Sequence, residues 1–508
     1  MMVAMKSNHT TMTLKQLLSG LAVSDYLPEI EVKGLALDSR QVAAGYVFIA
    51  LEGQFDHGLA YAEAAISRGA IAVLCDAKFD QYCQQILSRL MSRAICIPVR
   101  DLANKLPEMA KSFYAPKSEM FICGITGTDG KTSVSHFVAQ ALKLANKSAA
   151  VIGTLGNGLI ENLEESSHTT PDVMSLHKML ADFSQQNVDC VAMEVSSHGL
   201  DQNRVAGVEF DIAVLTNLSR DHLDYHGNIE NYKQAKKKLF TENNENTLVL
   251  NADDKFGDEL YLEIKNNKKI WLYGLSEKNV MRSKYYAYAN NVSNKADGIQ
   301  FMLHSSQGVA EIKLNLIGEF NVYNVLACFC VLLENKINFN HAIKYIQKLQ
   351  TVPGRMELLT YKNKPSVVVD FAHTPQALTQ ALENARKHCE GKLICVFGCG
   401  GGRDAGKRAL MARAAEELAD LIVVTNDNPR NESPEKIIDD IKQGISNELQ
   451  LIVEMDREKA IRYAIEVATE NDLILIAGKG HEQYQIIGNE KISFSDRNIA
   501  LSILKVHQ

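Results

Sequence analysis

Short apolar runs followed by amphipathic stretches recur along this chain of 508 residues. A continuous apolar run between turn residues is typical of a strand buried on both faces, and apolar spacing at i, i+3 and i+4 is typical of a helix. Their alternation predicts an α/β fold. The predicted strands are 70–74, 120–125, 188–195, 212–215, 366–370, 393–397, 421–425 and 473–477. The predicted helices are 131–145, 231–240, 321–334, 375–389 and 407–418.

Two segments are predicted to be domain boundaries. Pro116 interrupts the chain just before the strongest motif, and Pro353 with Gly354 follows a helical stretch. At roughly 100–200 residues per domain, the length favours about three domains. The predicted domains are therefore 1–116, 117–351 and 352–508.

Composition and charge narrow the class of protein. Hydrophobic residues make up 46% and charged residues 23%, as in ordinary globular proteins. The net charge is -7 without a long basic run, which argues against non-specific nucleic-acid binding. The ten cysteines lack zinc-site spacing, so free thiols in a reducing compartment are expected.

We predict a cytoplasmic protein, because residues 1–14 lack a signal-peptide core and no apolar run approaches the roughly 18 residues of a membrane helix. Polar stretches at 242–247 and 290–298 are predicted to be surface loops.

A glycine-rich loop is the strongest chemical motif. The strand predicted at 120–125 leads into Gly127-Thr128-Asp129-Gly130-Lys131-Thr132 and then into a helix. Such glycines let backbone N–H groups point at phosphate oxygens, while Lys131 can reach the β- and γ-phosphates and Thr132 can ligate Mg²⁺. Ile125 stands where the phosphate-loop pattern has its first glycine, so a chance glycine turn is the alternative. We interpret the loop as a nucleoside-triphosphate site.

Polar residues also follow the next predicted strands. Glu194 closes the apolar run 188–195, where a carboxylate could hold a metal ion beside phosphate. A surface glutamate is an equally good interpretation from the residues alone. The strand at 212–215 ends in a polar cluster at 216–222, which favours a ligand crevice.

Lys236 falls on an apolar helix stripe. Ile229, Tyr232 and Leu239 define that stripe by their spacing, and a buried lysine is costly unless it is paired or chemically changed. A neutral lysine amine can react with CO₂ to give a carbamate that binds Mg²⁺. In the alternative, the aliphatic part of the Lys236 side chain is buried while its ammonium reaches water. The residues alone favour this alternative.

Motifs along most of the chain occur in the order found in one family. They lie at 37–40, 127–132, 168–171, 194–200, 221–227, 318–324, 352–357, 370–375, 427–430 and 478–482. Through them the chain resembles the Mur ligases from about Leu37 to Arg497. The resemblance implies an ATP-dependent, amide-forming ligase of peptidoglycan synthesis. It also implies an N-terminal uridine-binding α/β domain, a central P-loop ATPase-like parallel sheet and a C-terminal Rossmann-like domain.

The resemblance implies which residues bind UDP-N-acetylmuramoyl-L-alanyl-D-glutamate and ATP. The nucleotide-dipeptide would be bound by Leu37, Ser39, Thr169, Thr170, Ser196, Gln202 and Arg204. ATP would be bound by Gly127, Thr128, Asp129, Gly130, Lys131, Thr132, Ser133, Asn321, Arg355 and Asp370. Asp129 replaces the asparagine usual in the family, and Phe371 replaces a tyrosine.

The resemblance also implies a metal-assisted reaction. Two Mg²⁺ ions would neutralise phosphate charge, with Thr132, Glu194, His222 and carbamylated Lys236 (N6-carboxylysine) as their ligands. The match places Lys236 where the family carries its carbamate, which reverses the preference drawn from the residues alone. The catalytic residues would then be Lys131, Glu194, His222 and Lys236.

The last third of the chain is expected to select the amino acid. meso-Diaminopimelate differs from lysine by a second carboxylate, which an arginine fork binds in a bidentate manner. The resemblance implies diaminopimelate-binding residues at Arg403, Asp427, Asn428, Pro429, Arg430, Gly478 and Glu482, with Glu482 holding the distal ammonium. A lysine-adding relative is the nearest alternative. The enzyme is expected to act as a monomer.

Two interpretations outside this family remain. A P-loop switch or motor would explain residues 120–136 and nothing after them. A dinucleotide oxidoreductase would explain a weak glycine pattern at Gly400, Gly402 and Ala405, but it leaves the phosphate loop unexplained.

Overall fold

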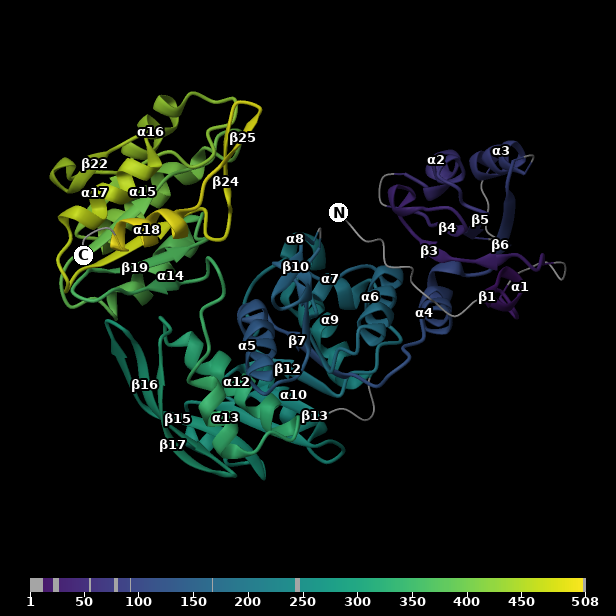
Figure 1. The fold of residues 1–508 in the computed structure, drawn as a ribbon, viewed down its shortest axis with the longest axis horizontal. Helices are drawn as coiled ribbons and strands as arrows, with labels where there is room; N and C mark the ends of the chain where they lie inside the picture. Colours follow the sequence, from purple (N-terminus) through teal and green to yellow (C-terminus); the bar gives the residue numbers. More distant parts are fainter. Residues whose placement is uncertain are drawn as a thin grey trace. The chain divides into compact units, whose positions relative to one another are not determined.

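The structure, a computed structural model, describes residues 12–21, 27–53, 56–76, 81–91, 93–166, 168–242 and 247–505 (Figure 1). Internal contacts divide the chain into two compact units. The first comprises Met1–Lys131, Asn146–Leu248 and Asn266–Lys269, and the second comprises Thr132–Ala145, Val249–Lys265 and Ile270–Gln508.

A four-stranded parallel sheet begins the first unit. Its order is β3 (Gly34–Ala36), β4 (Tyr46–Ala50), β5 (Ala72–Asp76) and β6 (Ile95–Val99). One face packs against α4 (Leu102–Phe113) and the other against α2 (Ala62–Ser67), which explains why the strands are almost uniformly apolar. The remaining elements here are β1 (Met12–Thr13), α1 (Leu14–Leu17), β2 (Glu31–Val32), η1 (Ser39–Gln41), η2 (Gly58–Tyr61) and α3 (Gln81–Leu90).

The largest sheet has eleven strands, in the order β10-β9-β8-β11-β7-β12-β13-β14-β15-β16-β17. The strands β8 (Ala149–Gly153), β11 (Cys190–Glu194), β7 (Phe121–Thr126) and β12 (Ile212–Leu215) are parallel neighbours. Their carboxyl ends share one edge, so the residues after them gather there. The other strands are β9 (Gly156–Leu159), β10 (Asn162–Glu164), β13 (Thr247–Asn251), β14 (Ile270–Gly274), β15 (Tyr285–Lys295), β16 (Gly298–Ser305) and β17 (Gly308–Leu314).

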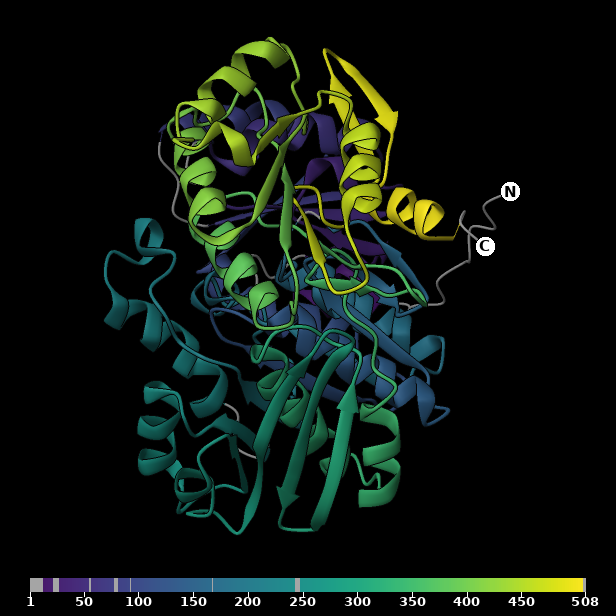
Figure 2. The same cartoon turned by 90° about the vertical axis from the view of Figure 1, so that its left-hand side faces the viewer.

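Helices follow most strands of this sheet, and long antiparallel strands extend it. Figure 2 shows β15, β16 and β17 as side-by-side arrows, and each neighbouring pair is antiparallel. The helices are α5 (Lys131–Leu144), α6 (Val173–Gln185), α7 (Ser197–Asp201), α8 (Leu223–His226), α9 (Ile229–Thr241), α10 (Lys255–Ile264), α11 (Glu277–Val280), α12 (Phe320–Glu334) and α13 (Phe339–Ile346).

A six-stranded sheet forms the C-terminal part of the second unit. Its order is β18 (Glu357–Leu359), β19 (Ser366–Asp370), β23 (Leu473–Ala477), β20 (Leu393–Phe397), β21 (Leu421–Val424) and β22 (Leu451–Val453), with only β18 antiparallel. One face packs against α14 (Pro375–Arg386), α15 (Gly406–Leu418) and α16 (Pro434–Lys442). The other packs against α17 (Arg457–Val467) and α18 (Asp496–Lys505). The hairpin β24 (Tyr484–Ile487) and β25 (Glu490–Ser493) and the short η3 (Glu448–Gln450) complete it.

The α/β prediction is confirmed, and one predicted loop is wrong. The strands predicted at 212–215, 366–370, 393–397 and 473–477 coincide with β12, β19, β20 and β23. The polar stretch 290–298 is not a loop, because β15 continues to Lys295 and β16 begins at Gly298. Its pairing is irregular between Asn290 and Ser293, which breaks the alternation expected of a strand. Of the other predicted loop, residues 243–246 lie outside the described residues.

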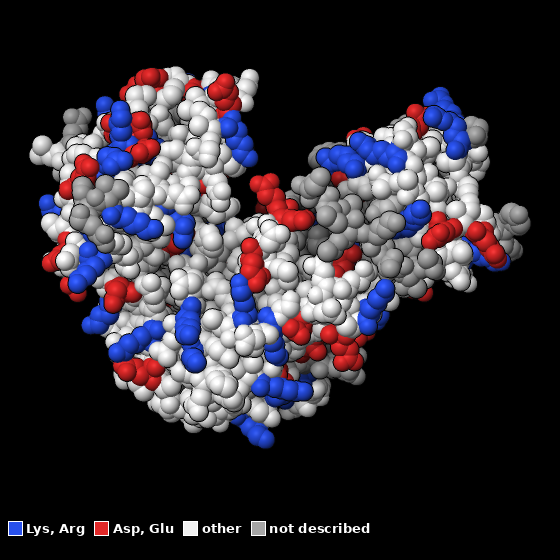
Figure 3. Space-filling model, in the orientation of Figure 1, with Lys and Arg blue, Asp and Glu red and all other residues white. Residues whose placement is uncertain are grey.

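The surface carries charges of both signs. On the face shown in Figure 3, Lys and Arg side chains are interspersed with Asp and Glu. Among the described residues, no helix combines the length and the apolar character needed to span a bilayer. The predicted domain boundaries and the expected monomer stay predictions.

Candidate functional site

The glycine-rich loop joins β7 to α5, as predicted. Gly127 has φ 149°, and a Cβ there would collide with the Thr216 hydroxyl at the end of β12. The Thr216 hydroxyl donates to the carbonyl of Asp129 at 2.6 Å, and the Asn217 side-chain oxygen accepts from the Asp129 N–H at 3.0 Å. The polar residues after β12 thus hold the loop in place from the neighbouring strand. Thr132 and Ser133 form the first turn of α5.

Two lysines donate to the same carbonyl of this loop. Lys131 Nζ donates to Gly127 O at 2.9 Å and to Thr128 O at 2.8 Å. Lys236 Nζ, from α9, donates to Gly127 O at 2.7 Å. Both ammonium groups therefore lie at the loop that is predicted to bind phosphate, and Lys131 is folded back on backbone acceptors.

Lys236 is buried, as its place in the helix pattern predicted. Its exposure is 1%, and its Nζ lies 4.6 Å from the centre of the Tyr232 ring. Burial, and then the neighbouring Lys131 charge, hold the pKa of Lys236 well below its ordinary value. Within the described ranges no ion pair to Lys236 occurs. One member of the predicted stripe is wrong, because Ile229 is 45% exposed and Ala235 is buried instead.

Glu194 is a buried carboxylate at the carboxyl end of β11. Its Oε1 accepts from the Thr154 N–H at 2.9 Å, and its Oε2 accepts from the Thr154 hydroxyl at 3.2 Å. A Cβ at Gly153 would collide with Glu194, so glycine is needed for this approach. The interpretation of Glu194 as a surface residue is wrong, since its exposure is 1%.

Four predicted dipeptide-binding residues are joined by hydrogen bonds. The Thr170 hydroxyl contacts the Ser196 hydroxyl at 3.1 Å and donates to Glu194 O at 2.9 Å. Arg204 donates to Thr170 O at 2.8 Å and to the Gln202 side chain at 2.7 Å. Thr169 contacts the Thr154 hydroxyl at 3.1 Å. Leu37 and Ser39 lie just after β3 in the four-stranded sheet.

His222 lies in a group of aromatic side chains. Its backbone is left-handed at φ 52°, and its ring centre lies 4.9 Å from that of His198. Tyr225, His226 and Tyr232 also belong to the group. Among the described residues there is no group of three or more His, Cys, Asp or Glu that could hold a metal ion by itself. A Mg²⁺ ion bound by one or two carboxylates and by substrate phosphates needs no such group.

The second unit holds the other predicted ATP residues. Asn321 is buried at the start of α12, where it donates to Ile317 O at 2.8 Å. Asp370, at the carboxyl end of β19, accepts from the N–H groups of Met356 and Ala372 at 2.7 and 2.8 Å. Burial raises the pKa of Asp370. The Arg355 guanidinium lies over the Phe371 ring, 5.4 Å from its centre. Phe371 is the residue that stands where the family usually has a tyrosine.

A buried charged cluster follows strands β21 and β23, which lie on either side of β20. Lys479 Nζ donates to Glu482 at 2.8 Å and to the Asn428 side chain at 3.2 Å, and it lies 3.7 Å from Asp427. Asn428 also donates to Glu482 at 3.0 Å. Burial raises the pKa of Asp427, against the opposing effects of Arg457 and Lys479. Gly478 has φ 116° and donates its N–H to Asp370 O at 3.1 Å.

Arg430 and Arg403 come from two adjoining loops. Arg430 has left-handed backbone at φ 53°, and its Nη1 donates to Gly401 O at 2.9 Å. The hairpin β24–β25 fixes this backbone, because Ile486 O accepts from the Arg430 N–H and Arg430 O accepts from the Gly488 N–H. Arg403 is exposed and follows the glycine loop that Arg430 contacts. Pro429, the residue before Arg430, is buried.

Sequence reasoning missed several residues of these clusters. Lys479 and Thr154 were not among the predicted site residues, although each touches one that was. A lysine between two glycines directly after a buried strand was the available signal for Lys479. Arg457 was also missed, and its guanidinium forms a fully buried ion pair with Asp496 at 2.7 Å while donating to Ala477 O at 2.9 Å.

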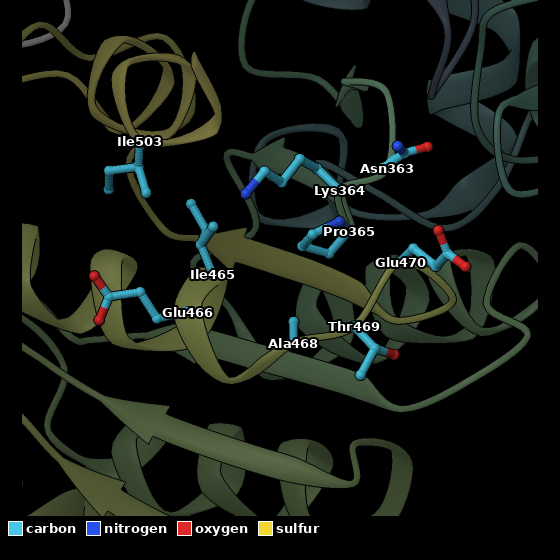
Figure 4. Close-up of a pocket in the computed structure, with 9 residues that line it drawn as sticks. All are labelled: Asn363, Lys364, Pro365, Ile465, Glu466, Ala468, Thr469, Glu470 and Ile503. Atoms are coloured by element: carbon cyan, nitrogen blue, oxygen red, sulfur yellow. The ribbon is translucent and has the colours of Figure 1, made fainter. Parts of the chain in front are cut away.

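A surface pocket of about 370 Å³ is lined by none of these residues (Figure 4). Lys364 and Pro365 precede β19, and Thr469 and Glu470 precede β23, so the pocket lies at the amino ends of the strands. Ligands in open α/β sheets bind at the carboxyl ends. The pocket is therefore no candidate for the predicted chemistry.

Comparisons with known proteins cover nearly the whole chain. The family descriptions that match are "Mur ligase family, catalytic domain" at 31–114, "Mur ligase middle domain" at 125–332 and "Mur ligase, glutamate ligase domain" at 354–480.

Three of the similar proteins carry the same name. A Coxiella burnetii protein called UDP-N-acetylmuramoyl-L-alanyl-D-glutamate--2,6-diaminopimelate ligase is 43% identical, over 92% of this chain and 94% of its own. A Haemophilus influenzae protein of the same name is 41% identical, over 97% of this chain and 100% of its own. A solved structure of a ligase with that name is 34% identical at a TM-score of 0.74, covering 97% of this chain and 99% of its own.

Proposed function

The chain belongs to the Mur ligase family, and from that premise we propose that it joins meso-diaminopimelate to UDP-N-acetylmuramoyl-L-alanyl-D-glutamate. The γ-carboxylate of D-glutamate attacks the γ-phosphate of ATP, which gives an acyl phosphate and ADP. The amine of diaminopimelate then attacks the acyl carbon, so an amide forms and phosphate leaves. We also propose that the protein is a monomer and that it acts in the cytoplasm.

The observation that carries the choice of amino acid is the pair of loops with Arg403 and Arg430. Arg430 Nη1 rests on the carbonyls of Gly401 and Asn428, at 2.9 and 3.4 Å, and not on a carboxylate. A guanidinium whose partners are neutral carbonyls can still take a ligand carboxylate in a bidentate, charge-assisted pair. Lysine has no second carboxylate to offer, so this contact favours diaminopimelate.

The buried cluster beside these loops supports an ammonium ligand. Asp427, Glu482 and Asp496 supply three carboxylates, whereas Lys479 and Arg457 supply two cations. By formal charge the cluster therefore carries one negative charge in excess. An incoming ammonium would balance that charge in a poorly solvated site, where an unbalanced charge is costly.

The phosphate site supplies positive charge and backbone donors. Phosphoryl transfer depends mainly on positioning and on stabilising charge. Lys131 can leave the carbonyls of Gly127 and Thr128 for the β- and γ-phosphates, which are stronger acceptors. Asn217 and Thr216 hold the loop from the adjacent strand while this happens.

We propose that Mg²⁺ is held by Glu194, Thr132, His222 and a carbamate on Lys236. Glu194 fits, because a carboxylate with a fixed orientation at a strand end is a usual ligand of Mg²⁺ beside phosphates. Lys236 fits a carbamate, because its lowered pKa favours the neutral amine that reacts with CO₂. The bound ions would offset phosphate charge. Protein incubated with ¹³C-bicarbonate should show a carbamate NMR signal that is absent from Lys236→Met. Identical spectra from the wild-type protein and the variant would exclude a carbamate on Lys236.

The proposed reaction is tested by ADP release. Purified protein is given the UDP-linked dipeptide, ATP and, in separate reactions, meso-diaminopimelate, lysine or no amino acid. We expect sustained ADP release with diaminopimelate only. Equal rates with lysine would make the chain a lysine-adding enzyme, and equal rates without any acceptor would indicate an ATPase with another output.

A further inference from the structure

The loops that carry Arg403 and Arg430 are bonded to each other along their length. Gly401 N–H donates to Asn428 O at 2.9 Å, and Arg430 Nη1 donates back to Gly401 O at 2.9 Å. A Cβ at Gly401 would collide with the Pro429 carbonyl, so the close approach requires glycine. The position of Gly401 therefore sets the direction of the Arg430 fork.

An ion pair holds the residues on either side of Gly401. Arg408, on α15, donates to both carboxylate oxygens of Glu432, at 2.7 and 2.8 Å. The same Glu432 carboxylate accepts from the Gly402 N–H at 3.0 Å, and Arg408 Nη2 lies 3.4 Å from Gly400 O, which it donates to. Glu432 lies two residues after Arg430 in the sequence. The pair thus joins the base of one loop to the base of the other.

The charges of this pair are strongly coupled. The Arg408 side chain is buried, with 1% exposed, and a second carboxylate, Asp440, accepts from its Nη1 at 2.8 Å. The Arg408 hydrogen bond, together with the Gly402 N–H, lowers the pKa of Glu432 to about 2. Glu432 is therefore ionised throughout the neutral range, and the pair is fully formed there.

Stability alone is a poor reason for such a pair. The Arg408 guanidinium is buried although Glu432 is partly exposed, and replacing buried ionic groups by apolar side chains of similar volume is often neutral or stabilising. Arg408 also keeps a buried Nε with no hydrogen-bond partner among the described residues, which is a further cost. A charge arrangement with these costs is better explained by what it positions.

We propose that Arg408 and Glu432 are positioning residues that set the spacing between the Arg403 and Arg430 loops, and thereby the recognition of the second carboxylate of diaminopimelate. Neither residue needs to touch the substrate. They hold Gly400 and Gly402, and Gly401 between them orients Arg430. The inference rests on the proposed function and names a further determinant of its specificity.

The test is steady-state kinetics of Arg408→Met, with diaminopimelate and with lysine at saturating ATP and UDP-linked dipeptide. Methionine keeps much of the side-chain volume and removes the fork. We expect the KM for diaminopimelate to rise about 10- to 100-fold, as for other residues that orient ligand-binding groups, with kcat changed less than about threefold. The ratio of kcat/KM for diaminopimelate to that for lysine should fall by the same factor, which a loss of stability alone would not cause.

Three further variants complete the test. Arg413→Met makes the same substitution on the exposed side of α15, and it should leave the KM unchanged. Glu432→Gln removes the charge at a partly exposed position and should raise the KM in the same direction, which decides the matter if Arg408→Met does not fold. Arg408→Lys keeps the charge and should restore part of the affinity.

The outcomes separate the inference from the reaction it rests on. A wild-type protein that does not use diaminopimelate overturns the proposed function and the inference with it. A wild-type protein that does, with Arg408→Met and Glu432→Gln retaining its KM and its selectivity, overturns the inference alone.

Discussion

Two lysines are equally buried in this molecule, but their surroundings are opposite. Lys236, at the phosphate loop, is 1% exposed and meets a carbonyl and an aromatic ring, with no carboxylate paired to it in the described part of the chain. Lys479, in the buried charged cluster that follows β21 and β23, is fully buried and pairs with Glu482, with Asp427 close by. One site therefore isolates an amine, and the other compensates an ammonium.

The difference shows what each site is suited to do. Burial without a counter-charge favours the neutral amine, which is a nucleophile and can be modified. A lysine that is buried beside carboxylates donates hydrogen bonds to them and so orients them for a ligand. The same residue type thus supports reactivity in one sheet and fixed charge in the other.

Lys236→Met should have the largest effect on catalysis, but it should not lower the stability of the protein. We expect kcat to fall roughly 10³-fold, the loss typical of removing a group that stabilises transition-state charge. The melting temperature should not fall, because the removed group is a buried amine that has no carboxylate partner in the described part of the chain. ADP release and thermal unfolding measure the two effects, and a variant that is less stable but fully active would contradict both.

The stability effect of Lys236→Met should depend on pH in CO₂-free buffer. Between the lowered pKa of Lys236 and its ordinary value of 10.5, the unfolded chain binds more protons than the folded one. Wild-type stability should therefore rise with pH through that window. The advantage of the variant in melting temperature should be greatest below the window and shrink as the pH rises through it, and a constant difference would reject this origin.

Arg430→Ala should have the next largest effect, because it removes the fork that takes the second carboxylate. We expect kcat/KM for diaminopimelate to fall by about 10²-fold or more, the usual cost of truncating one side of a desolvated charge pair. The value for lysine should change little. Arg430→Asn is the matched variant, because asparagine tolerates the left-handed backbone at φ 53°. Unchanged diaminopimelate kinetics in both variants would reject the assignment.

Lys479→Met sharpens the contrast between the two lysines. Removing the ammonium leaves the buried Asp427 and the partly exposed Glu482 without their nearest cation, at a cost of about 3 kcal/mol. At roughly 2–4 °C per kcal/mol for a domain of this size, the melting temperature should fall by about 6–12 °C. A melting temperature as high as that of Lys236→Met would show that the surroundings of the two lysines do not matter.

Asp129→Asn should have the smallest effect. The Asp129 side chain is exposed, and it places a negative charge beside the predicted phosphate site. Exposed charges interact weakly, so we expect the KM for ATP to fall by about two- to fivefold at low salt. The difference should fade at high ionic strength, because salt screens exposed charges. A KM for ATP that is unchanged at low salt would show that Asp129 does not face phosphate.

The sequence was informative where burial is uniform. The strands at 366–370, 393–397 and 473–477 were predicted at their observed bounds, because parallel strands covered on both faces are continuously apolar. The order of strand, glycine-rich loop and helix and the place of Lys236 on an apolar stripe were likewise predicted from local spacing. The spacing alone favoured an ammonium that reaches water, whereas the Lys236 side chain is buried. Residues 290–298 were misread as a loop, because polar residues and irregular pairing obscure the two strands there.

The charge networks could not be predicted in the same way. Arg408 and Glu432 are 24 residues apart, and Asn428 and Glu482 are 54 apart. Helical or strand periodicity carries no information at such separations, so only the tertiary fold shows which charges meet. The prediction that Ile229 is buried was wrong for a related reason. The apolar stripe of a helix does not show where the elements that cover the helix end.

The left-handed backbone of Arg430 also constrains how this sequence can drift. Every arginine codon lies a single base change from a glycine codon, and glycine adopts φ 53° without strain. β-Branched residues would be strained there. Loss of the guanidinium by mutation to glycine would therefore leave the loop intact, so descendants with a different amino-acid preference could arise without first losing the fold.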